Sequence, residues 1–143
     1  MTNEPLVLEK LYHTGSNKVW SALTNNSELQ HWYFSLDEFK AEIGFQFSFL
    51  AGENEIKYMH LCEVTEVVSG KKITYSWQYK GYPGLSYVSF ELFEQDKDTL
   101  VRLTHTGLES FISAGAPFAL EKFRGGWTYF LTIALQGYLE PAK

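Results

Sequence analysis

One histidine of this sequence stands where an imidazole could do chemistry. His105 closes the segment Val101–His105, in which alternate residues share a face, so it lies with Val101 and Leu103 on an apolar side. An imidazole among apolar groups can orient a ligand carbonyl or hydroxyl, or it can carry a proton. The alternative is a structural histidine held by a backbone or tyrosine partner, and we favour that alternative.

The other polar residues form no recognised pattern for catalysis or metal binding. Glu63 and Glu66 are three residues apart on an expected strand, so their carboxylates point to opposite faces and do not form an acid/base pair. No histidine has the spacing of a metal ligand, and no phosphate loop or nucleophile motif occurs. The lone Cys62 has the features of a small buried hydrophobe. We therefore expect no catalytic residue, no metal and no cofactor.

Aromatic residues are the most distinctive component of the chain, at 17% of its length. Those on inward-facing positions line either a ligand cavity or an ordinary core. We favour a cavity, because buried tyrosine hydroxyls and indole N–H groups need partners that water or a ligand can supply. The expected cavity residues are Trp32, Phe47, Phe49, Tyr75, Trp77, Tyr79, Phe90, His105, Phe123, Trp127, Phe130 and Leu131.

Most of these residues lie on expected β-strands, in which hydrophobicity has a period of two. From Ile73 to Lys80 apolar and polar residues alternate, which predicts that Tyr75, Trp77 and Tyr79 face inward together. Short helices are expected at 18–24 and 27–33. Strands are expected at 6–14, 38–43, 45–50, 57–68, 73–80, 86–94 and 99–106.

A long amphipathic helix is expected from Phe118 to Leu139, with an apolar stripe at spacings of three and four. Gly125 and Gly126 lie in its middle, at a cost of roughly 1 kcal/mol each relative to alanine. We predict that these glycines mark the closest approach of the helix to the rest of the fold.

The segment Gly107–Pro117, which precedes this helix, mixes large apolar residues with Ser, Gly and Ala. Such a composition is typical of a mobile, partly apolar lid. We expect the ligand to reach the cavity near this loop, and the lid residues to be Leu108, Phe111 and Ile112.

Composition restricts the class of partner. The 143 residues suit a single domain spanning 1–143. The net charge of -5 and the lack of a basic run argue against nucleic acid, and no apolar stretch reaches the roughly 18 residues of a membrane span. One cysteine and a polar N-terminus without a signal peptide indicate a cytoplasmic protein. We expect a monomer.

Several short motifs resemble those of one known superfamily. They are Val19-Trp20-Ser21-Ala22-Leu23-Thr24 with Leu29-Gln30-His31-Trp32, then Ile73-Thr74-Tyr75-Ser76-Trp77, Leu103-Thr104-His105-Thr106-Gly107, and Gly126-Trp127. The chain is similar in these motifs to the START-like (SRPBCC) superfamily, and within it to single-domain bacterial members of the activator of heat-shock-protein-90 ATPase homologue-like family. The resemblance implies an α+β helix-grip fold. In that fold a curved antiparallel sheet of about six or seven strands, two short helices and a long C-terminal helix enclose a hydrophobic cavity.

The resemblance leaves three functions open, because the superfamily includes lipid carriers, hormone receptors, polyketide cyclases and co-chaperone domains. The function that we favour is binding of a small hydrophobic molecule, either lipid-like or aromatic and polyketide-like, without chemistry. The second is a cyclase, dehydratase or hydrolase acting on such a molecule. The third is a chaperone-associated interaction in the stress response.

Overall fold

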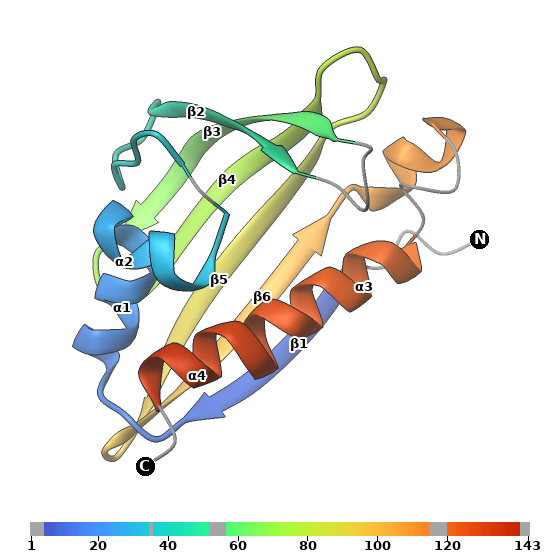
Figure 1. The fold of residues 1–143 in the computed structure, drawn as a ribbon. Coiled ribbons are helices and arrows are strands. Elements are labelled where there is room, and N and C mark those ends of the chain that lie inside the picture. The colour runs from blue at the N-terminus through green and yellow to red at the C-terminus, as the bar shows by residue number, and fades with distance from the viewer. Residues whose placement is uncertain (1–4, 35, 52–56, 115–119, 141–143) are drawn as a thin grey trace.

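A curved antiparallel sheet carries helices α1 to α4 on one face, which we call the inner face (Figure 1). The computed structural model describes residues 5–34, 36–51, 57–114 and 120–140, with side chains left out at 112–114 and 120. The six strands lie in the order β1-β6-β5-β4-β3-β2. Their bounds are β1 Leu6–Tyr12, β2 Gln46–Ala51, β3 Tyr58–Val68, β4 Lys72–Tyr79, β5 Ser86–Gln95 and β6 Asp98–Thr106.

The alternation of apolar and polar residues decides which side chains of each strand face inward. Trp77 of β4 is 2% exposed, whereas the next residue, Gln78, is exposed. A register slip of one residue would have reversed the two. Thr74 faces outward and is nevertheless buried, since its hydroxyl is hydrogen-bonded to that of Ser89 on β5 at 2.8 Å. The inward-facing residues are Tyr75, Trp77 and Tyr79, as predicted.

The sheet has an irregularity in β3. The pairing between β3 and β4 shifts by one residue between Val64 and Glu66, which leaves Thr65 as the inserted residue of a β-bulge. A bulge bends its strand and increases the local twist. It therefore helps β3 and its neighbour β2 curve toward the helices, as the ribbon in Figure 1 shows.

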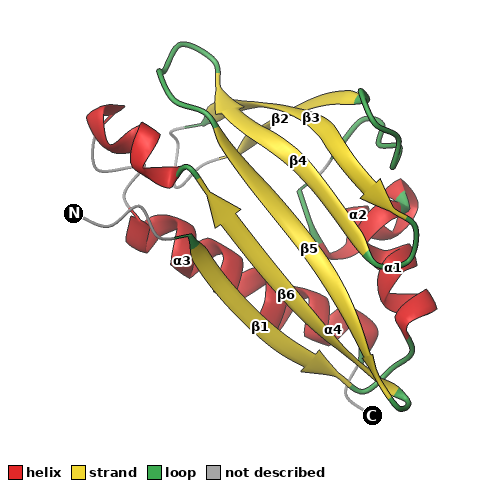
Figure 2. Cartoon of the chain, turned by 180° about the vertical axis from the view of Figure 1, so that it is seen from behind, coloured by secondary structure: helices red, strands yellow, loops and turns green. Residues whose placement is uncertain are grey.

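The helices fall into two groups. The short α1 (Ser16–Thr24) and α2 (Asn26–Trp32) follow β1, and a long helical run follows the last strand. That run consists of α3 (Leu120–Tyr129), a π-helical turn η3 (Phe130–Ala134) and α4 (Leu135–Leu139). Seen from behind in Figure 2, all of them lie beyond the sheet, so its outer face is turned to the viewer.

The π-helical turn is tied to the first strand. The backbone N–H of Leu135 donates to the carbonyl of Phe130, five residues earlier, which is the wider spacing of a π-turn. The Tyr12 hydroxyl, which is fully buried, donates to the carbonyl of Leu131 at 2.5 Å. This bond joins β1 to the C-terminal helical run across the core.

The expected strand at 38–43 is wrong, because the segment between α2 and β2 is irregular. Leu36 and Phe39 are both buried, and their spacing of three is that of a loop packing two side chains on the core, not of a strand. The expected start of the last helix, Phe118, lies outside the described residues.

The prediction for the helix glycines is also wrong. A Cβ atom added to Gly125 or Gly126 would meet no heavy atom within 4 Å. The buried stripe of the helix runs through Phe123, Trp127 and Leu131. At about 100° per residue, positions 125 and 126 point away from that stripe. The glycines therefore face solvent and create no close approach.

Candidate functional site

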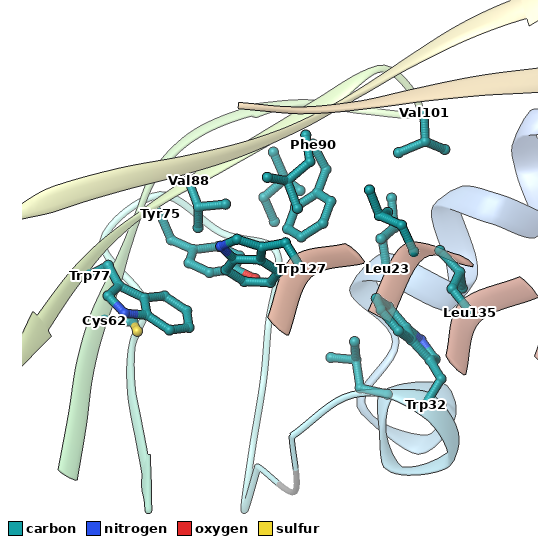
Figure 3. Packing of buried hydrophobic residues seen from close by; sticks show 14 of the residues in the cluster. Leu23, Trp32, Cys62, Tyr75, Trp77, Val88, Phe90, Val101, Trp127 and Leu135 are labelled. Carbon is teal, nitrogen blue, oxygen red and sulfur yellow. The ribbon is translucent and has the colours of Figure 1, made fainter. Parts of the chain in front are cut away.

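The inner face of the sheet and the C-terminal helical run meet in a cluster of aromatic rings. Figure 3 shows Trp127 reaching from α3 toward Tyr75 and Phe90 of the sheet. The ring centroid of Trp127 lies 5.4 Å from that of Trp77 and 6.0 Å from that of Phe90. Of the twelve expected cavity residues, all are buried except Phe130, which is half-buried. The structure therefore brings the set together, and ligand binding by it stays a prediction.

Trp32 joins this cluster from the side of the short helices. Its indole N–H donates to the backbone carbonyl of Ala22 at 2.9 Å, and its ring meets that of Phe130 edge-on at 6.1 Å. The indole is thus fixed by α1, and its ring closes one end of the interior.

His105 lies at the centre of a chain of hydrogen bonds. The Trp127 indole N–H, which can only donate, points to Nδ1 of His105 at 3.0 Å. Nδ1 must therefore be the bare acceptor, and the ring hydrogen is on Nε2, which donates to Oγ of Ser86 at 2.7 Å. The Ser86 hydroxyl is then directed to the carbonyl of Trp77 at 3.4 Å.

This network fixes the role of His105. The side chain is fully buried, and burial lowers its pKa from 6.5 to about 3. Both ring nitrogens are engaged by protein groups, so neither is available to a ligand. His105 is a structural histidine, held by tryptophan and serine side chains in place of the backbone or tyrosine partner that we expected.

Two residues that the sequence analysis missed fill the space between sheet and helix. Tyr33 and Phe34 directly follow α2. The ring of Tyr33 stacks on Trp127 at 6.2 Å with planes 20° apart. Phe34 stacks on Phe49 of β2 at 4.4 Å and meets Phe130 of the helix edge-on at 4.8 Å. The unbroken run of aromatic residues from position 32 to 34 was the available signal.

Both rings are half-buried, and Phe34 has neighbours on two sides. Phe34 is only half-buried although it is sandwiched between β2 and the helical run. Its ring also lies 6.1 Å from Trp77, so it reaches the deep part of the cluster. The ring of Phe34 is therefore partly exposed and packs between β2 and the helical run against buried rings, and we call the place that this ring fills the slot.

A second histidine, His60 of β3, was also missed. It is 6% exposed and stacks on Phe49 at 4.5 Å, with Tyr79 at 4.6 Å. Its Nδ1 is 2.9 Å from the carbonyl of Tyr58. Burial lowers its pKa to about 4, against the opposing effect of backbone contacts with Tyr58 and Phe49. The alternation of His60 with Cys62 and Val64 could have placed it on the inner face.

The expected lid contains a short 3-10 helix, η1 (Leu108–Ala114). Phe111 is fully buried, its ring 5.3 Å from Tyr79 and stacked on Phe123 at 5.9 Å. Leu108 is buried as well. The Ser110 hydroxyl accepts from the Leu85 N–H at 2.9 Å, which ties η1 to the turn before β5. The side chain of Ile112 lies outside the described residues.

A separate hollow of about 380 Å³ lies over β2, β3 and β4. Most of its lining is polar and belongs to outward-facing positions, although it also includes Phe47 of the aromatic cluster. Its lining residues are Gln46, Phe47, Ser48, Leu61, Cys62, Glu63, Ser76 and Gln78.

The described part of the chain contains no group of three or more His, Cys, Asp or Glu side chains placed to hold a metal ion. Within the same residues, none of the helices is both long and apolar enough to cross a membrane.

This arrangement of sheet and helices matches known proteins. The family model of the Activator of Hsp90 ATPase homolog 1-like proteins matches residues 13–140, and the chain belongs to that family. A comparison with curated proteins finds no match.

Solved structures share the fold. Protein CV1439 from Chromobacterium violaceum has a TM-score of 0.79 at 20% identity, over 99% of this chain and 100% of that one. DynU16, described as a putative protein in the dynemicin biosynthetic locus, has a TM-score of 0.77 at 16% identity, over 97% of this chain and 48% of that one. PFC0360w, described as an HSP90 activator from Plasmodium falciparum, has a TM-score of 0.70 at 19% identity, over 90% and 91%. At these identities the likeness shows the fold alone.

Proposed function

We propose that the protein binds a small, flat, mostly apolar molecule between the inner face of the sheet and the C-terminal helical run. The observation that carries the proposal is the slot held by Phe34, because a half-buried ring stacked between β2 and the helix can be replaced by a ligand ring. Offset and edge-on ring contacts of this kind contribute about 0.5–1.5 kcal/mol each beyond the burial of area.

The size of the expected affinity follows from the size of the ligand. Drug-sized ligands gain about 0.3 kcal/mol per non-hydrogen atom, so a ligand of about 20 atoms gains about 6 kcal/mol, or a Kd of some tens of micromolar. We propose that Leu108, Phe111 and Ile112 form a lid at one end of the site. The proposal places the protein in the cytoplasm, since its one cysteine is a buried free thiol. It also takes the protein to act as a monomer.

Chemistry on the bound molecule has less support. Catalysis by proton transfer needs a group whose pKa lies near the working pH. The pKa values of His60 and His105 are lowered to about 4 and about 3, and both nitrogens of His105 are already engaged. Binding without turnover is therefore the better description.

The test is native mass spectrometry of the purified protein, followed by titration with a panel of flat aromatic compounds. We expect a co-purified small molecule or, on titration, a change in tryptophan fluorescence, because Trp127 and Trp77 lie within the cluster. Backbone amide shifts around Phe34, Trp127 and η1 locate the site. The proposal is wrong if no compound of the panel changes the tryptophan fluorescence or the backbone amide shifts.

The family description and one structural neighbour favour a second candidate function, interaction with an Hsp90 chaperone. The measurement is the ATPase rate of an Hsp90 with and without a molar excess of this protein. A severalfold stimulation supports this candidate, and an unchanged rate together with ligand binding leaves the first proposal as the function.

A further inference from the structure

Two tyrosine hydroxyls meet inside the aromatic cluster. The oxygens of Tyr33 and Tyr75 are 2.6 Å apart. Tyr75 comes from the inner face of β4 and is 4% exposed, and Tyr33 follows α2. The rings of Phe47 and Phe39 stand edge-on to Tyr75, at 5.1 and 6.4 Å. The pair is therefore a polar group set among apolar rings.

One hydroxyl hydrogen of this pair has no acceptor among the described residues. Two hydroxyls carry two hydrogens, and the contact between them uses one of these. Within the described part of the chain, neither oxygen has a second hydrogen-bond partner. Other buried side-chain donors of the interior do have an acceptor. The Tyr12 hydroxyl donates to the carbonyl of Leu131, and the Trp32 indole N–H donates to that of Ala22. A buried donor left without an acceptor costs about 1–3 kcal/mol.

We infer that the Tyr33–Tyr75 pair is the polar end of the ligand site and that the ligand carries a neutral hydrogen-bond acceptor, such as a ketone or quinone oxygen. This inference rests on the proposed function. A carbonyl accepts the spare hydrogen and brings no donor of its own, which suits surroundings made of rings.

A charged acceptor does not fit the same place. Burial raises the pKa of Tyr75 above its ordinary value, which shows that negative charge is disfavoured at this oxygen. A carboxylate or phenolate ligand would be disfavoured there for the same reason, because no positively charged side chain among the described residues acts on the pKa of either hydroxyl. The ligand class is therefore a neutral, flat, aromatic ketone or quinone.

The slot and the pair are close enough to serve one molecule. The ring centroids of Phe34 and Tyr33 are 4.9 Å apart. A ligand ring in the place of Phe34 therefore lies beside the ring of Tyr33, and the inference requires that an adjoining ring brings its carbonyl to the Tyr33 hydroxyl. Two or three fused rings match this arrangement.

The experiment compares 9-fluorenone with fluorene, which share a flat three-ring skeleton and differ in the carbonyl. Binding of each is followed by tryptophan fluorescence, and the infrared carbonyl stretch of bound fluorenone is recorded. We expect fluorenone to bind about tenfold more tightly, the equivalent of one net hydrogen bond. We also expect the carbonyl stretch of bound fluorenone to lie at lower wavenumber than that of fluorenone in an apolar solvent.

Three variants test whether the preference for fluorenone over fluorene depends on the Tyr33–Tyr75 pair. Either Tyr33→Phe or Tyr75→Phe leaves one hydroxyl with a free hydrogen, so each single variant should keep most of the preference for fluorenone. The double variant should bind both compounds equally, with fluorene binding unchanged. Tyr129→Phe, on an exposed tyrosine of α3, is the matched control and should behave as the wild type.

The outcomes separate this inference from the proposed function. If both compounds bind the wild type equally, ligand binding stands and the inference about the carbonyl fails. If neither compound binds, both the proposed function and the inference about the carbonyl fail. If the double variant does not fold, the decision rests on the carbonyl stretch of fluorenone bound to the wild type, where a band at the position found in an apolar solvent overturns the inference.

Discussion

Trp127 donates its indole N–H to Nδ1 of His105 at 3.0 Å, and this single contact decides which nitrogen of the imidazole carries the hydrogen. It also joins the C-terminal helix to β6, since the two residues come from those elements. We expect His105 to be the neutral Nε2–H tautomer at pH 7 and at pH 5. Long-range ¹H–¹⁵N correlation spectra of the imidazole test this directly. A ring protonated at pH 5, or hydrogen on Nδ1, would contradict the network.

The two buried histidines should make the protein less stable in acid. The pKa of His105 is lowered to about 3 and that of His60 to about 4, while an unfolded histidine has a pKa near 6.5. Below pH 6.5 the unfolded chain therefore binds protons that the folded chain does not. Each histidine then lowers the free energy of unfolding by about 1.4 kcal/mol per pH unit, down to its folded pKa.

Urea unfolding at pH 7, 6 and 5 measures this slope. Replacing His60 by Gln should remove about half of the part of this pH slope that the two buried histidines contribute. His31→Gln, on the exposed face of α2, is the matched control. A wild-type slope unaffected by His60→Gln would show that this histidine is not neutral in the folded state.

Phe34→Ala should open the slot between β2 and the helical run. The ring is half-buried, so its loss should cost less than the 3–5 kcal/mol of a fully buried phenylalanine. Binding of a flat aromatic probe should become at least severalfold tighter, as measured by tryptophan fluorescence. Tyr87→Ala removes an exposed ring from β5 and should not alter binding. Weaker probe binding by Phe34→Ala would mean that this ring forms part of the site instead of occupying it.

Gly126→Ala should stabilise the protein. The added methyl group enters open space, and alanine exceeds glycine in helix propensity by about 1 kcal/mol, which corresponds to a rise in Tm of about 3–4 °C. Gly84→Ala is the contrasting control, because its Cβ would clash with the ring of Phe111 and its φ is +119°. That variant should lower the Tm. A fall in Tm for Gly126→Ala would restore a packing role for this glycine.

The sequence pattern was informative wherever one face of an element is buried. Alternation on β4 placed Trp77 inward because a period of two leaves only one register with the indole covered. The same reasoning failed at 38–43, where Leu36 and Phe39 pack as a loop. It also failed at Gly126, because two glycines in a helix have the same sequence signature whether they face a neighbour or solvent.

The candidate site was harder to anticipate than the fold. The alternation of residues predicted which aromatic side chains of the strands face inward. It could not show that Tyr33 and Phe34, which lie in an irregular segment, also point into the interior. Nor could it show that Trp127 and Ser86 hold both nitrogens of His105. Such contacts join residues far apart in sequence, and the periodicity of a local segment does not predict them.

The position of Phe34 has a consequence for any affinity measured on this protein. A ring on the same chain faces the slot at a high effective concentration, so an incoming molecule binds only the fraction of the protein in which that ring is withdrawn. If the withdrawn state were populated at about 1%, the apparent Kd would be about 100-fold weaker than the intrinsic one. A weak apparent Kd would then measure how tightly the chain occupies its own site.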